Sequence, residues 1–92
     1  MGDTGLAYLG GLSKLANLYL EGTRVTDAGL THLNKLSGLR ILILKNTAVS
    51  DPGLEQLNDC TSLHMLNVSG TKVTDKGVKK LQAALPMLRI TR

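Results

Sequence analysis

The sequence predicts an α/β solenoid, in which one strand–turn–helix unit is stacked on copies of itself. The first observation is a 24-residue period that several residue types follow. The second is that apolar residues alternate briefly with other residues in each period, which is typical of a strand with one buried face. Leucines three residues apart follow, as on a short helix. A fixed period of this length indicates a repeated supersecondary unit. The aligned positions are Asp3, Asp27, Asp51 and Asp75; Gly5, Gly29, Gly53 and Gly77; Thr23, Thr47 and Thr71; Val25, Val49 and Val73; and Leu9, Leu33, Leu57 and Leu81.

Each unit is expected to begin with a strand and a tight turn. In the unit that starts at Leu15, Leu18-Tyr19-Leu20 alternates with period two. The turn position that follows tolerates positive φ, because it holds Gly22, Asn46 or Gly70. The next residue in each unit is a threonine whose hydroxyl can bond to neighbouring backbone.

A short helix is expected to complete each unit. Asp27 is a good N-cap residue, so we predict caps at Asp27, Asp51 and Asp75, with Pro52 at the first helical position. The glycine two residues after each aspartate disfavours a helix, and its recurrence predicts tight packing between neighbouring units. The predicted helix ends are Ser37-Gly38, Thr61-Ser62 and Pro86.

The predicted domain is 1–92, divided into a partial repeat (1–14), full repeats (15–38, 39–62 and 63–86) and a terminal strand (87–92). The first part is expected to be a helical half-repeat, which leaves the strand near Leu18 with an open edge. Open edges in a sheet invite pairing with another chain. We expect the C-terminus to be a natural end of the array, and the N-terminus to be either abbreviated or an artificial boundary within a longer protein.

The pattern L-x-x-L-x-L-x-x-T-x-V-T-D-x-G-L-x-x-L-x-x-L, read from Leu15 to Leu36, resembles the leucine-rich repeat. The later units follow it, with substitutions such as Ser50 and Val68. The VTD-x-GL form is similar to 24-residue repeats of bacterial proteins and to the cysteine-containing repeats of F-box adaptors. The resemblance implies a right-handed horseshoe with parallel strands on the concave face, short helices on the convex face, and a binding role.

Composition narrows the function classes without naming a partner. The chain has 92 residues, a net charge of +4, one cysteine and no Phe or Trp. A single cysteine permits no internal disulfide. We find no secretory signal and no apolar run long enough to cross a membrane, so the default expectation is a cytoplasmic protein.

No residue set predicts catalysis, a cofactor or a metal site. Cys60 shares its column with Leu12, Leu36 and Ala84, so we expect a buried small apolar side chain rather than a nucleophile. His32 and His64 lack partners at metal-ligand spacing. The aspartates at 24-residue spacing could suggest a calcium ladder, but helix caps are the favoured interpretation. Asn67-Val68-Ser69 matches a glycosylation sequon inside a predicted strand, which we interpret as coincidence.

Positive charge is concentrated in the last third of the chain, where Asp75 is expected to be the only acidic counterpart. This stretch could bind nucleic acid or an acidic surface. However, no aromatic residues are interleaved for base stacking, and a solvated helix face is the favoured interpretation. The residues are Lys72, Lys76, Lys79, Lys80, Arg89 and Arg92.

The concave sheet face is the predicted binding surface. Strand alternation directs Leu18, Leu20, Leu42, Leu44, Leu66 and Val68 inward, so the intervening residues face outward. Stacking by 24 aligns them as Asn17-Ile41-Met65-Arg89, Tyr19-Ile43-Asn67-Thr91 and Glu21-Lys45-Ser69. Strands about 4.8 Å apart would unite Tyr19, Ile41, Ile43 and Met65 in one apolar patch, with Asn17, Lys45, Asn67 and Arg89 at its rim. Grouped exposed apolar side chains indicate an interface.

The sequence therefore predicts a non-catalytic module that binds another protein through the concave face. One alternative is a self-associating structural module that forms homodimers through open strand edges or the concave face. A third possibility is binding of nucleic acid or an acidic surface by the basic C-terminal residues.

Overall fold

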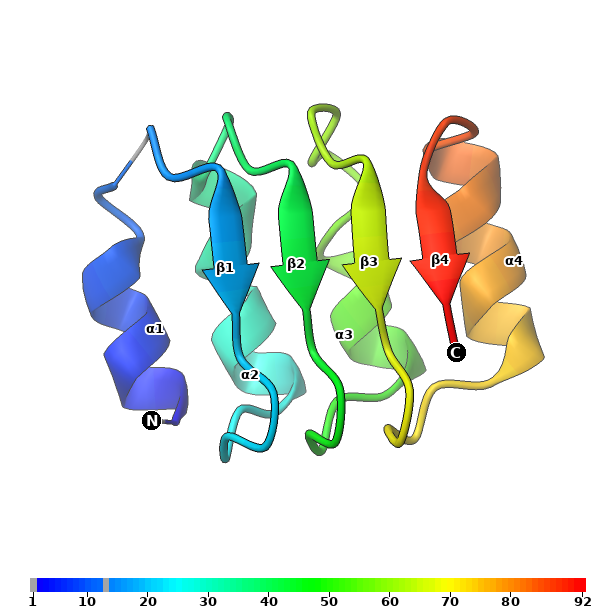
Figure 1. Ribbon diagram of the computed structural model, residues 1–92, viewed down its shortest axis with the longest axis horizontal. Coiled ribbons are helices and arrows are strands. Elements are labelled where there is room, and N and C mark those ends of the chain that lie inside the picture. Colours follow the sequence, from blue (N-terminus) through cyan, green and yellow to red (C-terminus); the bar gives the residue numbers. More distant parts are fainter. Residues whose placement is uncertain (1, 13) are drawn as a thin grey trace.

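The computed structural model describes residues 2–12 and 14–92 and has two layers, a parallel sheet with helices packed behind it (Figure 1). The strands lie in the order β1-β2-β3-β4, and strands alternate with helices along the chain. This arrangement confirms the α/β solenoid of parallel strands. The strands are β1 (Asn17–Tyr19), β2 (Ile41–Ile43), β3 (Met65–Asn67) and β4 (Arg89–Thr91); the helices are α1 (Asp3–Leu9), α2 (Asp27–Leu30), the 3-10 turn η1 (Leu33–Lys35), α3 (Asp51–Glu55) and α4 (Asp75–Ala84).

The strand register follows the 24-residue period without a slip. Asn17 pairs with Ile41, Ile41 with Met65, and Met65 with Arg89. A slip of one residue would exchange the two faces of a strand. The predicted alternation is therefore confirmed: Leu18, Leu42 and Leu66 are buried between the sheet and the helices, and the residues on either side of each face the opposite way.

The turn after each strand has the predicted geometry. Gly22, Asn46 and Gly70 have φ values of 69°, 59° and 70°, a region that glycine and asparagine enter most readily. The next residue in each unit donates its hydroxyl to a carbonyl three residues back, at 2.8 Å for Thr23 to Leu20. The same bond forms from Thr47 to Leu44 at 2.7 Å and from Thr71 to Val68 at 2.6 Å.

The aspartates are not the N-caps that the sequence suggested, and this prediction is wrong. The cap positions are Thr26, Ser50 and Thr74, and each aspartate is the first helical residue. Its carboxylate extends to the next unit instead. Asp51 Oδ1 accepts the Thr74 N–H at 2.8 Å, and Oδ2 accepts the Thr74 hydroxyl at 2.5 Å. Asp3 and Asp27 accept the same pair of bonds from Thr26 and Ser50.

The carboxylate explains why a glycine recurs two residues after each aspartate of the repeat. Gly53 lies directly beside Asp27, and a Cβ at Gly53 would overlap the Asp27 carboxyl oxygen. Gly29 has the same relation to Asp3, and Gly77 to Asp51. The predicted tight packing between units is thus confirmed, and its cause is an aspartate of the preceding unit.

The helices differ in length more than the repeat suggests. α2 and α3 end at Leu30 and Glu55, well before the predicted ends, whereas α4 continues to Ala84. The Lys-Lys-Leu-Gln-Ala-Ala run of α4 has high helix propensity, while Asn and Asp follow α3. The segment between the longer helix and β4 is shifted by one residue relative to the period: Leu85 is buried and Ala84 is exposed. Cys60 is therefore matched by Leu85, not by Ala84 as predicted.

Candidate functional site

The face of the sheet that the helices leave uncovered is the candidate site, and we call it the open sheet face (Figure 1). It consists of outward-facing residues of four strands and of the positions that follow them. The pairings place two rows across the strands, as the sequence predicted. The rows are Asn17-Ile41-Met65-Arg89 and Tyr19-Ile43-Asn67-Thr91.

Apolar side chains occupy the middle of the open sheet face. Tyr19 is 65% exposed and Met65 is 48% exposed. Ile41 and Ile43 lie between them on β2 and are half-buried, because they have neighbours on both sides. These four residues come together on three adjacent strands, and the helices cover none of them.

The polar residues around this patch are partly engaged within the chain. Lys45 forms an ion pair with Glu21 at 4.0 Å, and both side chains are about half exposed. Asn67 is half-buried and its Oδ1 accepts the Ser69 N–H at 2.9 Å. Asn17 and Arg89 are exposed at the two edge strands. Asn17 and Arg89 are therefore the more accessible of the predicted rim residues.

Sequence analysis missed the residues at the amino-terminal ends of the strands. Met87 is 85% exposed, although its equivalents Leu39 and Leu63 in the two preceding units are buried. The one-residue shift after α4 puts Leu88 into the core and turns Met87 outward. Two shallow hollows of about 430 and 460 Å³ meet at His64 and Met65. Their lining contains no acidic residue and is formed by Ala16, Asn17, Arg40, Ile41, His64, Met65, Met87 and Arg89.

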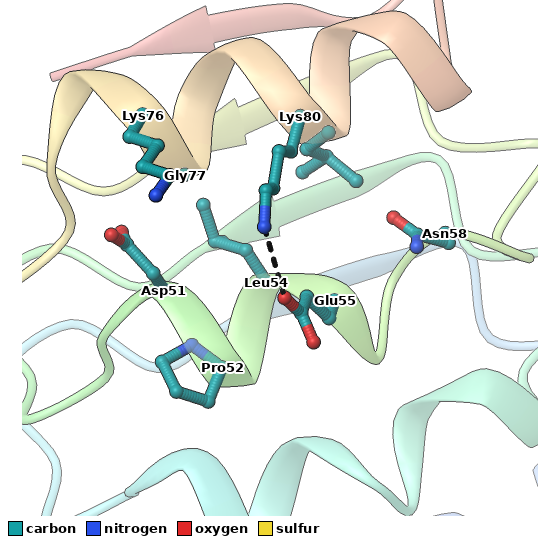
Figure 2. A pocket seen from close by; sticks show the side chains of 9 residues that line it. Asp51, Pro52, Leu54, Glu55, Asn58, Lys76, Gly77 and Lys80 are labelled. Atoms are coloured by element: carbon teal, nitrogen blue, oxygen red, sulfur yellow. Dashed lines mark ion pairs between the residues drawn. The ribbon is translucent and has the colours of Figure 1, made fainter.

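A smaller groove of about 190 Å³ lies on the helical side, between α3 and α4. Figure 2 shows Lys80 extending from α4 to Glu55 on α3, with an N–O distance of 3.9 Å. Asp51 lies opposite Gly77 in the same groove. Hydrogen bonds from the Thr74 hydroxyl and N–H lower the pKa of Asp51, and the charges of Arg92 and Lys80 act in the same direction. The polar groups of this groove join two units.

The residues considered for catalysis or metal binding lie at different places in the structure. Cys60 is buried, and burial together with the charge of Asp59 raises the pKa of its thiol; a raised pKa lowers the reactive thiolate fraction. His64 is exposed and its Nδ1 lies 2.6 Å from the Ser62 carbonyl, whereas His32 is half-buried on the helical side. Within residues 2–12 and 14–92, no three His, Cys, Asp or Glu residues are grouped as metal ligands.

The basic residues of the last third do not form one surface. Lys76, Lys79 and Lys80 lie on α4, behind the sheet, whereas Arg89 lies on the open sheet face. Arg92 pairs with Asp75. A second acidic residue, Glu55 of the preceding unit, pairs with Lys80 from outside this stretch.

Comparison with known proteins gives one family match. Residues 59–81 match the family model described as "Leucine Rich repeat". These residues run from the end of the α3 unit through β3 into α4, and therefore include one complete strand and turn. No curated protein matches the chain. None of the described helices is long and apolar enough to cross a membrane.

Proposed function

We propose that this chain is a leucine-rich repeat protein, as the match of residues 59–81 to that family's model supports, and that it is a non-catalytic module that binds another protein through the open sheet face. Solenoids of this kind present an extended surface rather than enclosing a reaction centre. The observation that carries the proposal is the apolar patch of Tyr19, Ile41, Ile43 and Met65 on a face that no helix covers. A sheet face that only contacts solvent would carry polar side chains instead.

The patch has an apolar centre and a polar rim, as protein interfaces do. An aromatic, a methionine and two isoleucines form its centre, and such side chains are enriched where an interface is fully desolvated. Asn17 and Arg89 flank the patch at the edge strands, where a partner could accept hydrogen bonds from them. Lys45 and Asn67 complete the proposed rim. To contact a partner, Lys45 would replace or share its ion pair with Glu21, and Asn67 would replace or share its hydrogen bond with Ser69.

The proposal is tested by comparing wild-type protein with Ile43→Glu in affinity capture from nuclease-treated lysate of the source cells. A carboxylate at the centre of the patch would have to be desolvated on binding, at a cost that a partner cannot offset without a matching cation. We expect a protein that the wild type enriches to be lost, by about tenfold or more. Direct titration of that protein with purified wild type and variant then gives the affinity change.

Asn34→Glu is the matched control, because it adds the same charge to an exposed position on the helical side. Circular dichroism of both variants checks that the fold is intact. If Asn34→Glu loses the same partner, or if Ile43→Glu keeps it, the open sheet face is not the binding surface.

A further inference from the structure

Basic side chains gather at the amino ends of the strands, which form the upper edge of the sheet in Figure 1. Arg40 directly precedes β2, His64 directly precedes β3, and Arg89 begins β4. All three residues are exposed. Within the part of the chain that the structure describes, none of them takes part in an ion pair. This edge of the sheet therefore carries positive charge that the described residues do not pair.

Backbone hydrogen bonds align these residues across the sheet. The Arg40 N–H donates to the Ala16 carbonyl at 2.7 Å, and the His64 N–H donates to the Arg40 carbonyl at 2.8 Å. The Arg89 N–H donates to the His64 carbonyl at 2.9 Å. Neighbouring strands lie about 4.8 Å apart, so Arg40 and Arg89 are about 10 Å apart across β2, β3 and β4. Arg40 and His64 belong to internal units of the stack, so their alignment follows from the repeat itself.

The basic residues border the apolar patch of the open sheet face directly. Arg40 and His64 line one of the two hollows together with Ile41 and Met65. Arg89 lines the adjoining hollow, again with Met65. Neither lining contains an acidic residue. A ligand that places an apolar group against Met65 would therefore bring its neighbouring groups to the two arginines.

Carboxylates are the groups that this arrangement favours in a ligand. A guanidinium presents a planar fork of donors that matches a carboxylate. Nucleic acid fits less well, because its evenly spaced phosphates are best held by a continuous basic track, whereas here two arginines flank apolar side chains. No aromatic residue lines either hollow for base stacking. The complementary occupant is a protein segment that combines carboxylates with an apolar side chain.

We infer that the partner contributes an extended acidic segment to the open sheet face, with an apolar side chain on Ile41 and Met65 and carboxylates bound by Arg40 and Arg89. An extended chain rises about 3.3 Å per residue, so carboxylates about three residues apart span the distance between the two arginines. Opposite charges also accelerate the encounter, and salt weakens this attraction. The inference rests on the proposed function, since it names the chemistry of the partner that the open sheet face binds.

Selection of random peptides displayed on phage tests the inference with a defined probe. The wild-type protein is the bait, and the composition of the enriched peptides is compared with that of the starting library. We expect Asp and Glu to be enriched close to an apolar residue. A synthetic peptide of an enriched sequence is then titrated at low and at high salt, and we expect its affinity to be lower at high salt.

Charge reversal identifies the residues that bind the carboxylates. The double variant Arg40→Glu, Arg89→Glu should bind the synthetic peptide about tenfold more weakly or worse, and should itself enrich peptides that contain Lys and Arg. Lys72→Glu with Lys79→Glu is the matched control, because both residues are exposed away from the amino ends of the strands and the net charge changes equally. This control should enrich the same acidic peptides as the wild type. Circular dichroism checks the fold of each variant.

Ile43→Ser separates the inference from the proposed function, because it removes apolar surface from the patch without adding charge. Peptides that lose binding with Ile43→Ser but show no acidic preference would retain the open sheet face as the binding surface and overturn only the inference. An acidic preference that persists in the arginine double variant, or a wild type that enriches no peptide, would also overturn it. So would equally tight binding of a single-stranded DNA oligonucleotide that the double variant loses. If Ile43→Ser binds the acidic peptides as the wild type does, the proposed function fails together with the inference.

Discussion

At the residue scale, the aspartates that begin the first three helices, Asp3, Asp27 and Asp51, each serve two units at once. The backbone of each aspartate forms the first turn of its own helix, and its carboxylate accepts two bonds from the cap residue of the next unit. The carboxylate therefore lies at the amino ends of two neighbouring helices, where negative charge is favoured. The glycine of the next unit leaves the space that this carboxylate occupies. Aspartate and glycine recur together because each requires the other.

We predict that Gly53→Ala destabilises the protein by about 2 kcal/mol, because the new methyl group overlaps the Asp27 carboxylate and displaces it from Ser50. Alanine normally stabilises a helix relative to glycine, so the expected sign is the reverse of the usual one. Gly11→Ala is the control, since a Cβ at Gly11 has nothing within 4 Å. Urea denaturation measures both. Equal effects of the two substitutions would contradict the explanation.

We also predict an acid sensitivity that Asp51 causes. The bonds from Thr74 hold its pKa below the ordinary value of 3.8 in the folded state. The resulting contribution to stability is fully present above that value and is lost as the pH falls through the lowered pKa. The free energy of unfolding should therefore decrease below about pH 4, and Asp51→Asn should remove part of this decrease. The measurement is urea unfolding at several pH values. An unchanged acid slope in the variant would refute the assignment.

At the element scale, the helices differ in length and in the contacts that stabilise their ends. α2 and α3 are a single turn each, too short to be stable alone, and their ends are held by contacts with neighbouring units. α4 is ten residues long and is followed by a chain reversal into β4. Gln82 stabilises that reversal: its Nε2 lies 3.1 Å from the Leu85 carbonyl and 2.7 Å from the Leu88 carbonyl. No pattern in the sequence marked Gln82 as a helix-ending residue.

We predict that Gln82→Ala loosens the connection from α4 to β4. Carbonyls that lose their donor lower the stability by about 1 kcal/mol, and hydrogen exchange of β4 amides should accelerate while β2 amides change little. Gln82→Glu has the same shape but no donor, so it should be at least as destabilising. A stable Gln82→Glu variant would show that the contacts with the Leu85 and Leu88 carbonyls contribute nothing.

At the scale of the whole molecule, stability is distributed over stacked layers rather than a central core. A middle layer is covered on both sides, and an end layer on one. Leu42 of β2 is fully buried between Leu18 and Leu66, whereas Ile90 on the edge strand β4 is only half-buried. The consequence of removing an apolar side chain should depend on its layer.

We predict that Leu42→Ala costs about 2–5 kcal/mol, a large share of the total for a small domain. Ile90→Ala should cost clearly less, because solvent already reaches the side chain. Thermal unfolding followed by circular dichroism compares the two variants with the wild type. Equal losses at the two positions would argue against stability that is divided among layers.

The sequence by itself determined the repeat, the parallel strands and their register, the left-handed turn residues and the inward leucines. The repeat, the register, the turn residues and the inward leucines depend on local conformation and on a period that every unit obeys, so spacing predicts them. The parallel arrangement of the strands was implied by the resemblance to the leucine-rich repeat. The sequence repeat also predicted that Tyr19, Ile41, Ile43 and Met65 lie together, because stacked strands bring equivalent positions side by side. The role of this patch in binding stays a prediction.

Only the tertiary structure decided where the aspartate carboxylates point, where α2 and α3 end, and that Met87 faces outward. An aspartate before a helix is a plausible cap by local rules, and only the neighbouring unit supplies better donors for its carboxylate. The shift after α4 accompanies a helix of ten residues, where α3 has five and α2 has four. Local patterns cannot predict the direction of the carboxylates, because it depends on contacts between residues 23 positions apart.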